Sequence, residues 1–232
     1  MLTLRKSEDR GVTKISWLDS RHSFSFGDYR DPAFVNFGPL RVINEDVIAG
    51  GGGFQPHPHR DMEIVTYILS GALQHKDSLG NGSIIRPGEI QKMSAGSGIV
   101  HAEFNASKER STHLLQIWIV PSKEGIQPSY EQKTIDPQAV ANKFARIASP
   151  DPRENEVSIV QDAEIWAAKL DKGAEAIHPL AQGRRAWIQV AQGEIEFGNQ
   201  ILKAGDAAGI TDDGNITVRA KAPSEILLFD MA

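Results

Sequence analysis

Hydrophobic residues in the first half of the chain recur in short extended runs rather than with a helical period. β-Branched and apolar residues dominate these runs, which is typical of buried strands. Turn-forming residues separate them, most clearly at Gly80-Asn81-Gly82 and Pro87-Gly88-Glu89. The pattern predicts strands over residues 22–26, 40–44, 62–70, 83–86, 90–94 and 113–120. Short strands at nearly regular spacing predict an all-β sandwich or barrel.

The second half of the chain repeats this style. We predict strands over residues 157–160, 163–170, 186–191, 194–197, 215–218 and 225–229. One short helix is expected over residues 136–145, with Pro137 at its start. Residues 73–89 and 191–206 share an extended run followed by glycine-containing turns, which indicates two copies of one β-barrel. We therefore expect one domain over residues 1–125 and a second over residues 126–232.

Composition excludes several classes of protein. The chain has 232 residues and a formal net charge of −5, which does not favour binding to nucleic-acid phosphates. It has no cysteine, so disulfides, thiolate ligands and iron–sulfur clusters are excluded. No apolar run approaches the roughly 20 residues that span a bilayer, and the first ten residues lack the apolar core of a signal peptide. We expect a cytoplasmic protein without direct membrane or nucleic-acid contacts.

Two short stretches carry the candidate chemistry. His57 and His59 stand two residues apart, and Glu63 follows four residues later. His101 and Glu103 form a second pair with a spacing of two. Because a strand turns residues i and i+2 to the same face, each pair points one way, and Glu63 joins the first pair if that segment stays extended. Imidazoles and a carboxylate that converge from two strands predict a site for a divalent first-row metal.

These stretches resemble the two signatures of the cupin superfamily. The first signature is matched by Gly51, His57-Pro58-His59, Glu63 and Gly71. The second is matched by Gly98, His101 and Asn105, whereas Gly96 and Ile90 stand where it usually has proline and glycine. The wider pattern over residues 57–64, 75–78, 95–103 and 113–119, with residues 22–26 and 40–44, resembles the pirin family. The resemblance is close over residues 10–130 and looser beyond them.

The resemblance implies an all-β bicupin: two antiparallel, jelly-roll type β-barrels packed face to face, with one mononuclear metal in the N-terminal barrel. Pirin-like bacterial and animal proteins include quercetin 2,3-dioxygenases, which cleave a flavonol with dioxygen to a depside and carbon monoxide. The implied partners are therefore dioxygen and a small aromatic enolisable substrate, quercetin or a related compound. Animal pirins are also described as nuclear co-regulators, which leaves a metal-dependent redox-sensing protein that acts through protein partners as the alternative.

Carried over by position, the implied metal ligands are His57, His59, His101 and Glu103. Fe(II) is the expected metal, with Mn, Ni, Co, Cu or Zn as alternatives. Most cupins use the carboxylate at Glu63, whereas pirins use the one at Glu103. We favour Glu103 as the ligand and assign Glu63 a supporting role at a histidine or a bound water. Glu103 and Glu63 are also the candidate catalytic residues, because either carboxylate could take the proton of a substrate hydroxyl.

Other histidines have structural interpretations. His75 and Asp77 could serve the site, but we favour a hydrogen bond that forms a turn. His22 and His113 lie in predicted strands and are interpreted as hydrogen-bonded core or barrel-rim residues. His178 has no partner at metal-ligand spacing and is interpreted as structural or exposed.

Overall fold

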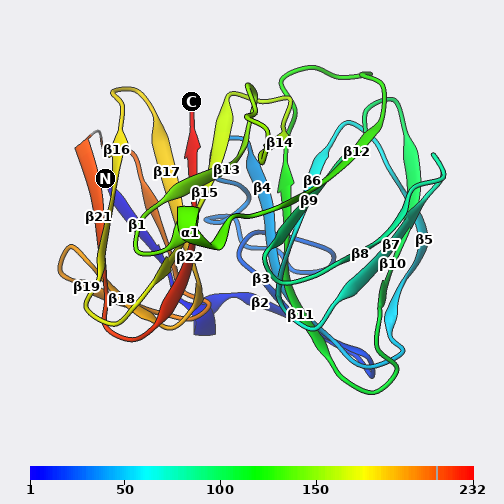
Figure 1. The fold of residues 1–232 in the computed structure, drawn as a ribbon, viewed down its shortest axis with the longest axis horizontal. Helices are drawn as coiled ribbons and strands as arrows, with labels where there is room; N and C mark the ends of the chain where they lie inside the picture. The colour runs from blue at the N-terminus through cyan, green and yellow to red at the C-terminus, as the bar shows by residue number, and fades with distance from the viewer. Residues whose placement is uncertain (213) are drawn as a thin grey trace. The chain divides into compact units, whose positions relative to one another are not determined.

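A computed structural model describes residues 1–212 and 214–232 (Figure 1). The chain forms two compact units. One comprises Gly11–Thr134 and Val157–Gln161, and the other comprises Met1–Arg10, Ile135–Glu156 and Asp162–Ala232. The first ten residues thus group with the C-terminal part of the chain, although the sequence placed them in the first domain. The domain limits at residues 125 and 126 stay a prediction.

The N-terminal unit contains two antiparallel sheets (Figure 1). The first has the strand order β12-β9-β6-β11-β4-β3-β2, and the second has the order β5-β10-β7-β8. The short β14 (Val157–Ser158) also belongs to this unit. The bounds are β2 (Gly11–Lys14), β3 (Leu18–His22), β4 (Leu40–Ile48), β5 (Gly53–His59), β6 (Glu63–Ser70), β7 (Leu73–Asp77), β8 (Gly82–Ile85), β9 (Glu89–Ser94), β10 (Ile99–Asn105), β11 (Thr112–Ile119) and β12 (Ser129–Thr134).

The interior of the N-terminal unit holds two apolar clusters, at separate places along the strands. One contains buried side chains of Leu18, Ile48, Ile68, Leu73, Ile85 and Leu114. The other contains Ile64, Met93, Ala95 and Ile99. Each cluster takes residues from both sheets, as expected where apolar faces of two sheets meet. These clusters hold β5 and β10 in place, and those two strands carry the predicted metal ligands.

The C-terminal unit repeats the two-sheet architecture. One sheet has the strand order β1-β20-β17-β22-β15-β13, and the other has the order β16-β21-β18-β19. The bounds are β1 (Leu2–Arg5), β13 (Ala145–Ser149), β15 (Ala163–Leu170), β16 (Glu175–Leu180), β17 (Arg185–Gln192), β18 (Glu194–Phe197), β19 (Gln200–Lys203), β20 (Ala207–Ile210), β21 (Gly214–Ala220) and β22 (Ser224–Met231).

An apolar cluster lies in the interior of the C-terminal unit. Its members are small or branched aliphatic residues from both sheets, including Leu170, Ile188, Val190, Val218 and Leu228. The two-barrel fold predicted from the sequence is confirmed. Among the described residues, the groups of potential metal ligands lie in the first barrel and not in the second.

Several local predictions are wrong in extent, and two of them have a clear local cause. The strand expected over residues 22–26 ends at His22, and the chain then bends into a loop in which the Ser25 hydroxyl donates to Asp31 O and the Asp31 amide donates back to Ser25 Oγ. Side-chain hydrogen bonds of this kind compete with strand pairing. The helix expected over residues 136–145 is only α1 (Pro137–Val140), because Asn142 has a φ of 55°. A left-handed residue cannot continue a right-handed helix.

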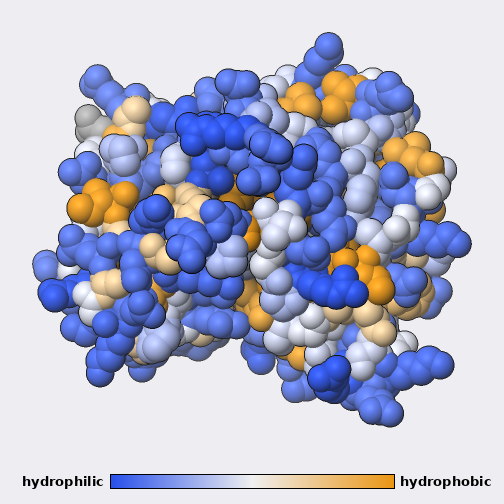
Figure 2. Space-filling model, viewed as in Figure 1, coloured by the Kyte–Doolittle hydropathy of each residue, from blue (hydrophilic) through white to orange (hydrophobic). Residues whose placement is uncertain are grey.

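The outside of the protein is mixed in polarity. On the face shown in Figure 2, hydrophobic residues form separate groups among hydrophilic ones. The structure describes two short helices, α1 and the 3-10 helix η1 (Ser7–Asp9), and neither is long and apolar enough to cross a membrane.

Candidate metal centre

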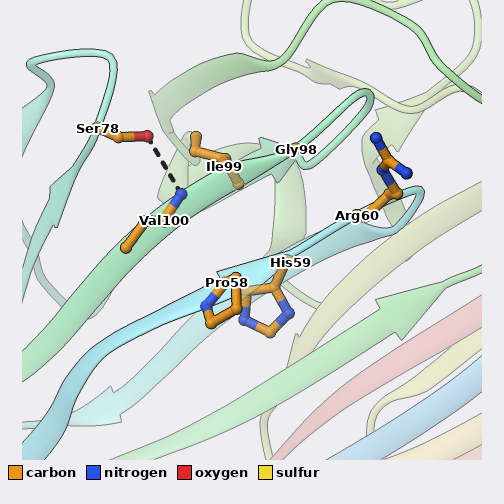
Figure 3. A pocket seen from close by; sticks show the side chains of 7 residues that line it. All are labelled: Pro58, His59, Arg60, Ser78, Gly98, Ile99 and Val100. Carbon is orange, nitrogen blue, oxygen red and sulfur yellow. Dashed lines mark hydrogen bonds between the residues drawn. The ribbon is translucent and has the colours of Figure 1, made fainter.

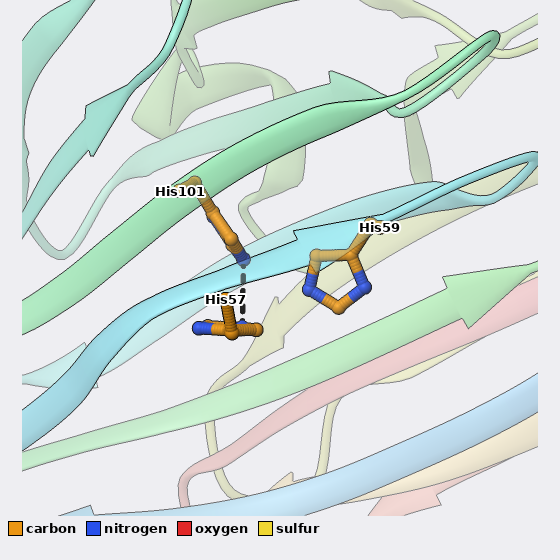
Figure 4. Close-up of side chains that lie close together, drawn as sticks. All are labelled: His57, His59 and His101. Atoms are coloured by element: carbon orange, nitrogen blue, oxygen red, sulfur yellow. Dashed lines mark hydrogen bonds between the residues drawn. The ribbon is translucent and has the colours of Figure 1, made fainter.

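Strands β5 and β10 place three histidines on one face of a sheet (Figure 4). His57 and His59 alternate along β5, so their side chains point the same way. β10 pairs with β5 in antiparallel register, with His101 opposite His57. Directly opposed residues in such a pair present their side chains on the same face. The spacing of two residues and the strand register together bring the three imidazoles into one cluster.

The three imidazoles face one another closely. The Nε2 atoms of His57 and His101 are 3.1 Å apart. Ring centroids are separated by 4.5 Å for His57 and His101 and by 4.8 Å for His59 and either neighbour. One ligand atom from each of the three histidines lies within 4.8 Å of the others. His57 Nδ1 lies 2.7 Å from the carbonyl oxygen of Gln55, which can only accept, so Nδ1 carries the proton and Nε2 presents a lone pair.

The surroundings of His59 and His101 keep these two imidazoles neutral. Burial, followed by the neighbouring His57 and His75, lowers the pKa of His101 to about 3. Burial, followed by His101 and His57, lowers the pKa of His59 to about 4. Burial disfavours the charged form of an imidazole, and nearby imidazolium groups add repulsion. A neutral imidazole is the form that ligates a metal, so the pair is ready for coordination at neutral pH.

Glu103 lies on the same face of β10, two residues beyond His101. Its Oε2 accepts a hydrogen bond of 2.8 Å from Gln116 Nε2, and the oxygen of that amide accepts from Thr66 Oγ1 at 2.9 Å. Its Oε1 is buried and has no hydrogen-bond partner among the described residues. The amide of Gln116 thus fixes one carboxylate oxygen, and the other is left for a ligand.

His75, on β7 opposite Glu103, forms a second group with His101 and Glu103, in which the ligand atoms again lie within 4.8 Å. His75 Nε2 and Asp77 Oδ2 are 3.1 Å apart, and Asp77 also accepts from the Asn81 amide. From the sequence, a hydrogen bond that forms a turn was favoured for His75 and Asp77 over a role at the metal site. The spacing of two residues between His75 and Asp77 was the available signal that His75 also faces the histidine cluster.

Glu63 lies elsewhere. Its Oε2 accepts from Ser94 Oγ at 2.9 Å and from the Val160 amide at 3.3 Å, and it belongs to neither group of potential metal ligands. The expectation that it shares a face with His57 and His59 is wrong, because β5 ends at His59 and Asp61 has a φ of 47°. Glu63 then begins β6, which belongs to the other sheet. Burial raises its pKa, although Lys92 and these hydrogen bonds oppose that rise.

A cavity of about 600 Å³ opens onto the histidine cluster and is lined by His57, His59 and Glu103. Its volume falls within the range of about 300–1,000 Å³ that is typical of small-molecule sites. Aromatic side chains form much of the lining: Trp17, Phe26, Phe54 and Trp118. Phe26 and Phe54 line the cavity, whereas four other apolar residues, Phe24, Phe37, Met62 and Val65, do not.

A polar wall of the same cavity was not foreseen. Asp46, in β4, is 3% exposed, and its Oδ1 has no hydrogen-bond partner among the described residues. Burial raises its pKa to about 7, although a hydrogen bond with Ser20 opposes the rise. The strand predicted over residues 40–44 is longer in the structure, because β4 continues to Ile48. Polar residues can occupy this strand because two of them, Asn44 and Asp46, face the cavity.

The remaining histidines have carboxylate, amide or hydroxyl partners. His22 Nδ1 lies 2.8 Å from Asn44 Oδ1, and its Nε2 lies 2.9 Å from Thr13 Oγ1. His113 Nε2 is 2.9 Å from Glu45 Oε1. In the C-terminal unit, His178 Nε2 is 2.8 Å from Asp230 Oδ2. The prediction of structural roles for these three histidines agrees with these contacts.

A second depression, of about 410 Å³, lies at the turn that follows His59 (Figure 3). It is lined by Pro58, His59, Arg60, Ser78, Gly98, Ile99 and Val100. The Val100 amide donates to Ser78 Oγ at 3.1 Å, and the Arg60 guanidinium donates to Ser97 O. The bond of Arg60 ties the turn between β5 and β6 to the loop before β10, and the bond of Ser78 ties β10 to the turn after β7. Together they support the strand ends that carry His59 and His101.

The histidines and Glu103 fit a divalent metal. Two nitrogen ligands about 2.1 Å from one ion and at right angles to each other lie about 3.0 Å apart. The 3.1 Å between Nε2 of His57 and Nε2 of His101 matches this spacing. Two imidazole lone pairs this close repel unless a proton or a cation lies between them. The buried, unpartnered Oε1 of Glu103 supplies negative charge beside the cluster.

A double β-barrel with imidazoles and a carboxylate at a cavity in one barrel defines a cupin metalloprotein. The family model described as Pirin matches residues 4–119, and that described as Quercetinase C-terminal cupin domain matches residues 146–231. The chain belongs to the pirin family.

Relatives match along the whole length. The chain is 46% identical over 231 residues to a quercetin 2,3-dioxygenase of Escherichia coli (strain K12), covering 100% of this chain and 99% of the relative. It is also similar to the crystal structure of the bacterial pirin YhhW from Escherichia coli in complex with nickel(II). That match has a TM-score of 0.94, 44% identity, and coverage of 100% of this chain and 99% of the other. The full-length match to enzymes of this kind identifies the chain as a cupin metal enzyme.

A more distant structure shows the fold alone. A quercetin 2,3-dioxygenase from Acinetobacter baumannii aligns with a TM-score of 0.75 at 19% identity, over 96% of this chain and 84% of that one. The bicupin architecture therefore persists where few residues are shared.

Proposed function

We propose that this protein is a dioxygenase that cleaves a flavonol such as quercetin at a mononuclear metal held by His57, His59, His101 and Glu103. The observation that carries the proposal is the convergence of the three imidazoles and Glu103 on one aromatic-lined cavity. The names of the full-length relatives support the same reaction. In that reaction one flavonol and one dioxygen give one depside and one carbon monoxide, and no further oxidant or reductant is consumed.

Glu103 has a double role in this proposal. Its Oε2 stays hydrogen-bonded to Gln116, while Oε1 faces the ligand site. A flavonol hydroxyl that enters the cavity transfers its proton to this carboxylate. The ordered amide of Gln116 keeps the carboxylate in place before and after this transfer. We assign Glu63 no part in the proton transfer, because it does not line the cavity and its Oε2 accepts hydrogen bonds from Ser94 and Val160.

The cavity walls position the substrate and exclude water. Trp118 packs edge-on against His59 at 5.0 Å and against Phe26 at 5.4 Å. Trp17 packs edge-on against Phe54 at 5.1 Å. Aromatic rings of a flavonol find matching apolar surface between these two pairs. The Trp118 indole N–H is buried and has no partner among the described residues, so it is available to donate to an oxygen of the bound ligand.

A divalent metal at this site would act as a Lewis acid toward a deprotonated substrate oxygen and would supply the redox chemistry that dioxygen requires. Fe(II) is the ion we propose, on the basis of mixed imidazole and carboxylate ligands. The nickel(II) in the bacterial pirin structure shows that a related protein binds another ion of this series. Metal analysis of protein purified without added metal tests this choice, and an equimolar content of another ion would contradict it.

Anaerobic reconstitution with Fe, Mn, Co, Ni or Cu, followed by quercetin and dioxygen, tests the activity. Loss of flavonol absorbance with stoichiometric carbon monoxide is the expected result. His101→Ala should abolish both metal binding and turnover. His113→Ala is the matched control, since this histidine contacts Glu45 and does not line the cavity. Absence of quercetin loss with every metal would refute flavonol cleavage.

A further inference from the structure

Asp46 is a buried carboxyl group in the cavity wall that the proposed metal chemistry does not use. Its side chain is 3% exposed, it lines the cavity, and its Oδ1 has no hydrogen-bond partner among the described residues. A buried acceptor without a donor is costly, so such atoms call for an explanation. The cavity beside it offers space in which a ligand could supply the donor.

The neighbours of Asp46 in the wall hydrogen-bond to one another, which leaves Oδ1 of Asp46 without a partner. His22 bridges Asn44 and Thr13, with contacts of 2.8 Å and 2.9 Å. Gln116 bridges Thr66 and Glu103. Among the described residues, Asp46 itself has only the hydrogen bond with Ser20, which lies opposite it on β3.

Strand register places Asp46 across the cavity from the metal ligands. It lies in β4, where its neighbour in the adjacent strand β11 is Leu114. The histidines and Glu103 lie on β5 and β10, in the other sheet. A ligand that reaches Asp46 and the histidine cluster together must therefore extend from one sheet to the other, as a molecule of several fused or linked rings can.

We propose that Asp46 binds a hydroxyl group of the substrate, on a ring other than the one that reaches the metal. This inference rests on the proposed function and specifies its substrate class as polyhydroxylated flavonols. A phenolic O–H donates to the free Oδ1, while Ser20 keeps the carboxyl group oriented. The burial that raises the pKa of Asp46 to about 7 is consistent with a group kept for recognition rather than for stability.

Ligand binding without turnover tests the assignment. Metal-loaded protein is kept free of dioxygen and titrated with a flavonol hydroxylated on both ring systems. Two analogues are titrated alongside, one lacking the pendant-ring hydroxyls and one lacking the fused-ring hydroxyls. Quenching of Trp17 and Trp118, which line the cavity, reports the dissociation constant. The proteins are wild type, Asp46→Ala, Asp46→Asn and the control Asp151→Asn, whose side chain is exposed and does not line the cavity.

Wild type should bind one of the two analogues about tenfold or more weakly than it binds the parent flavonol. Asp46→Ala should bind that analogue and its hydroxylated parent equally, and Asp46→Asn, which keeps one acceptor oxygen, should retain part of the preference. Asp151→Asn should behave like wild type. An unchanged preference in folded Asp46→Asn and Asp46→Ala would overturn the assignment, as would a wild type without preference. If the preference appears as expected but no flavonol is consumed in dioxygen, flavonol cleavage fails and the binding role of Asp46 stands.

Discussion

The free energy of unfolding of metal-free Asp46→Asn, compared with that of metal-free wild type, should increase as the pH rises from 4 to 8. The side chain is almost fully buried, and burial raises its pKa from 3.8 to about 7. Asparagine has the same shape and carries no charge at any pH. The difference in unfolding free energy between the two proteins therefore isolates the ionisation of Asp46.

The sign follows from proton linkage. Between pH 3.8 and about 7, the folded protein keeps a proton on Asp46 that the unfolded chain has lost. Wild type is therefore stabilised by this group at low pH and loses that contribution as the pH rises through this window. Each pKa unit corresponds to about 1.4 kcal/mol, so the full loss amounts to about 4 kcal/mol. The advantage of Asp46→Asn should grow by up to that amount from pH 4 to pH 8.

Urea unfolding of chelator-treated proteins at a series of pH values measures the difference, provided the transitions are two-state. Asp77→Asn is a control of opposite sign. Burial alone would raise the pKa of Asp77, but hydrogen bonds from Asn81, His75 and Leu79 lower it overall. Its stabilising contribution is therefore complete above pH 3.8 and is lost only as the pH falls toward the lowered value.

Asp77→Asn should accordingly be destabilising by a nearly constant amount over pH 4–8. A free-energy difference between Asp46→Asn and wild type that stays flat over this range would refute the reasoning. It would mean that Asp46 is ionised in the folded protein at pH 4, and hence that a donor or cation compensates its burial.

Four further predictions concern the metal ligands, the residues that support them, and Glu63. His101→Ala should lose the bound metal measured by elemental analysis, while the far-ultraviolet circular dichroism stays that of a β protein. Gln116→Ala removes the donor to Glu103 and should weaken metal affinity about 10–100-fold in a competition titration with a chelator; unchanged affinity would contradict the positioning role. Gly53→Ala should also weaken metal affinity, because a Cβ there would lie 2.5 Å from the carbonyl oxygen of Glu103 and push β5 off β10. Glu63→Gln should retain full metal content, and loss of metal would restore Glu63 as a ligand.

Local patterns in the sequence were enough to predict most strands and the histidine cluster. Alternation along a strand depends only on backbone geometry, so the spacing of His57 with His59 and of His101 with Glu103 already sets which side chains share a face. The turns between the strands are equally local, because they depend on glycine, asparagine and proline. The same reasoning failed for Glu63, where one left-handed residue, Asp61, sends the chain into a different sheet.

The sequence by itself therefore determined an all-β bicupin with a histidine-rich centre in its first barrel. Only the tertiary structure decided which polar side chains face the cavity, since that depends on which strands pair across the barrel. Asp46 lies beyond the strand predicted over residues 40–44, but the pairing of β4 with β3 and β11 places it in the cavity wall. Pairing of β7 with β10 likewise brings His75 beside Glu103. These contacts join residues far apart in the chain, and no local pattern encodes them.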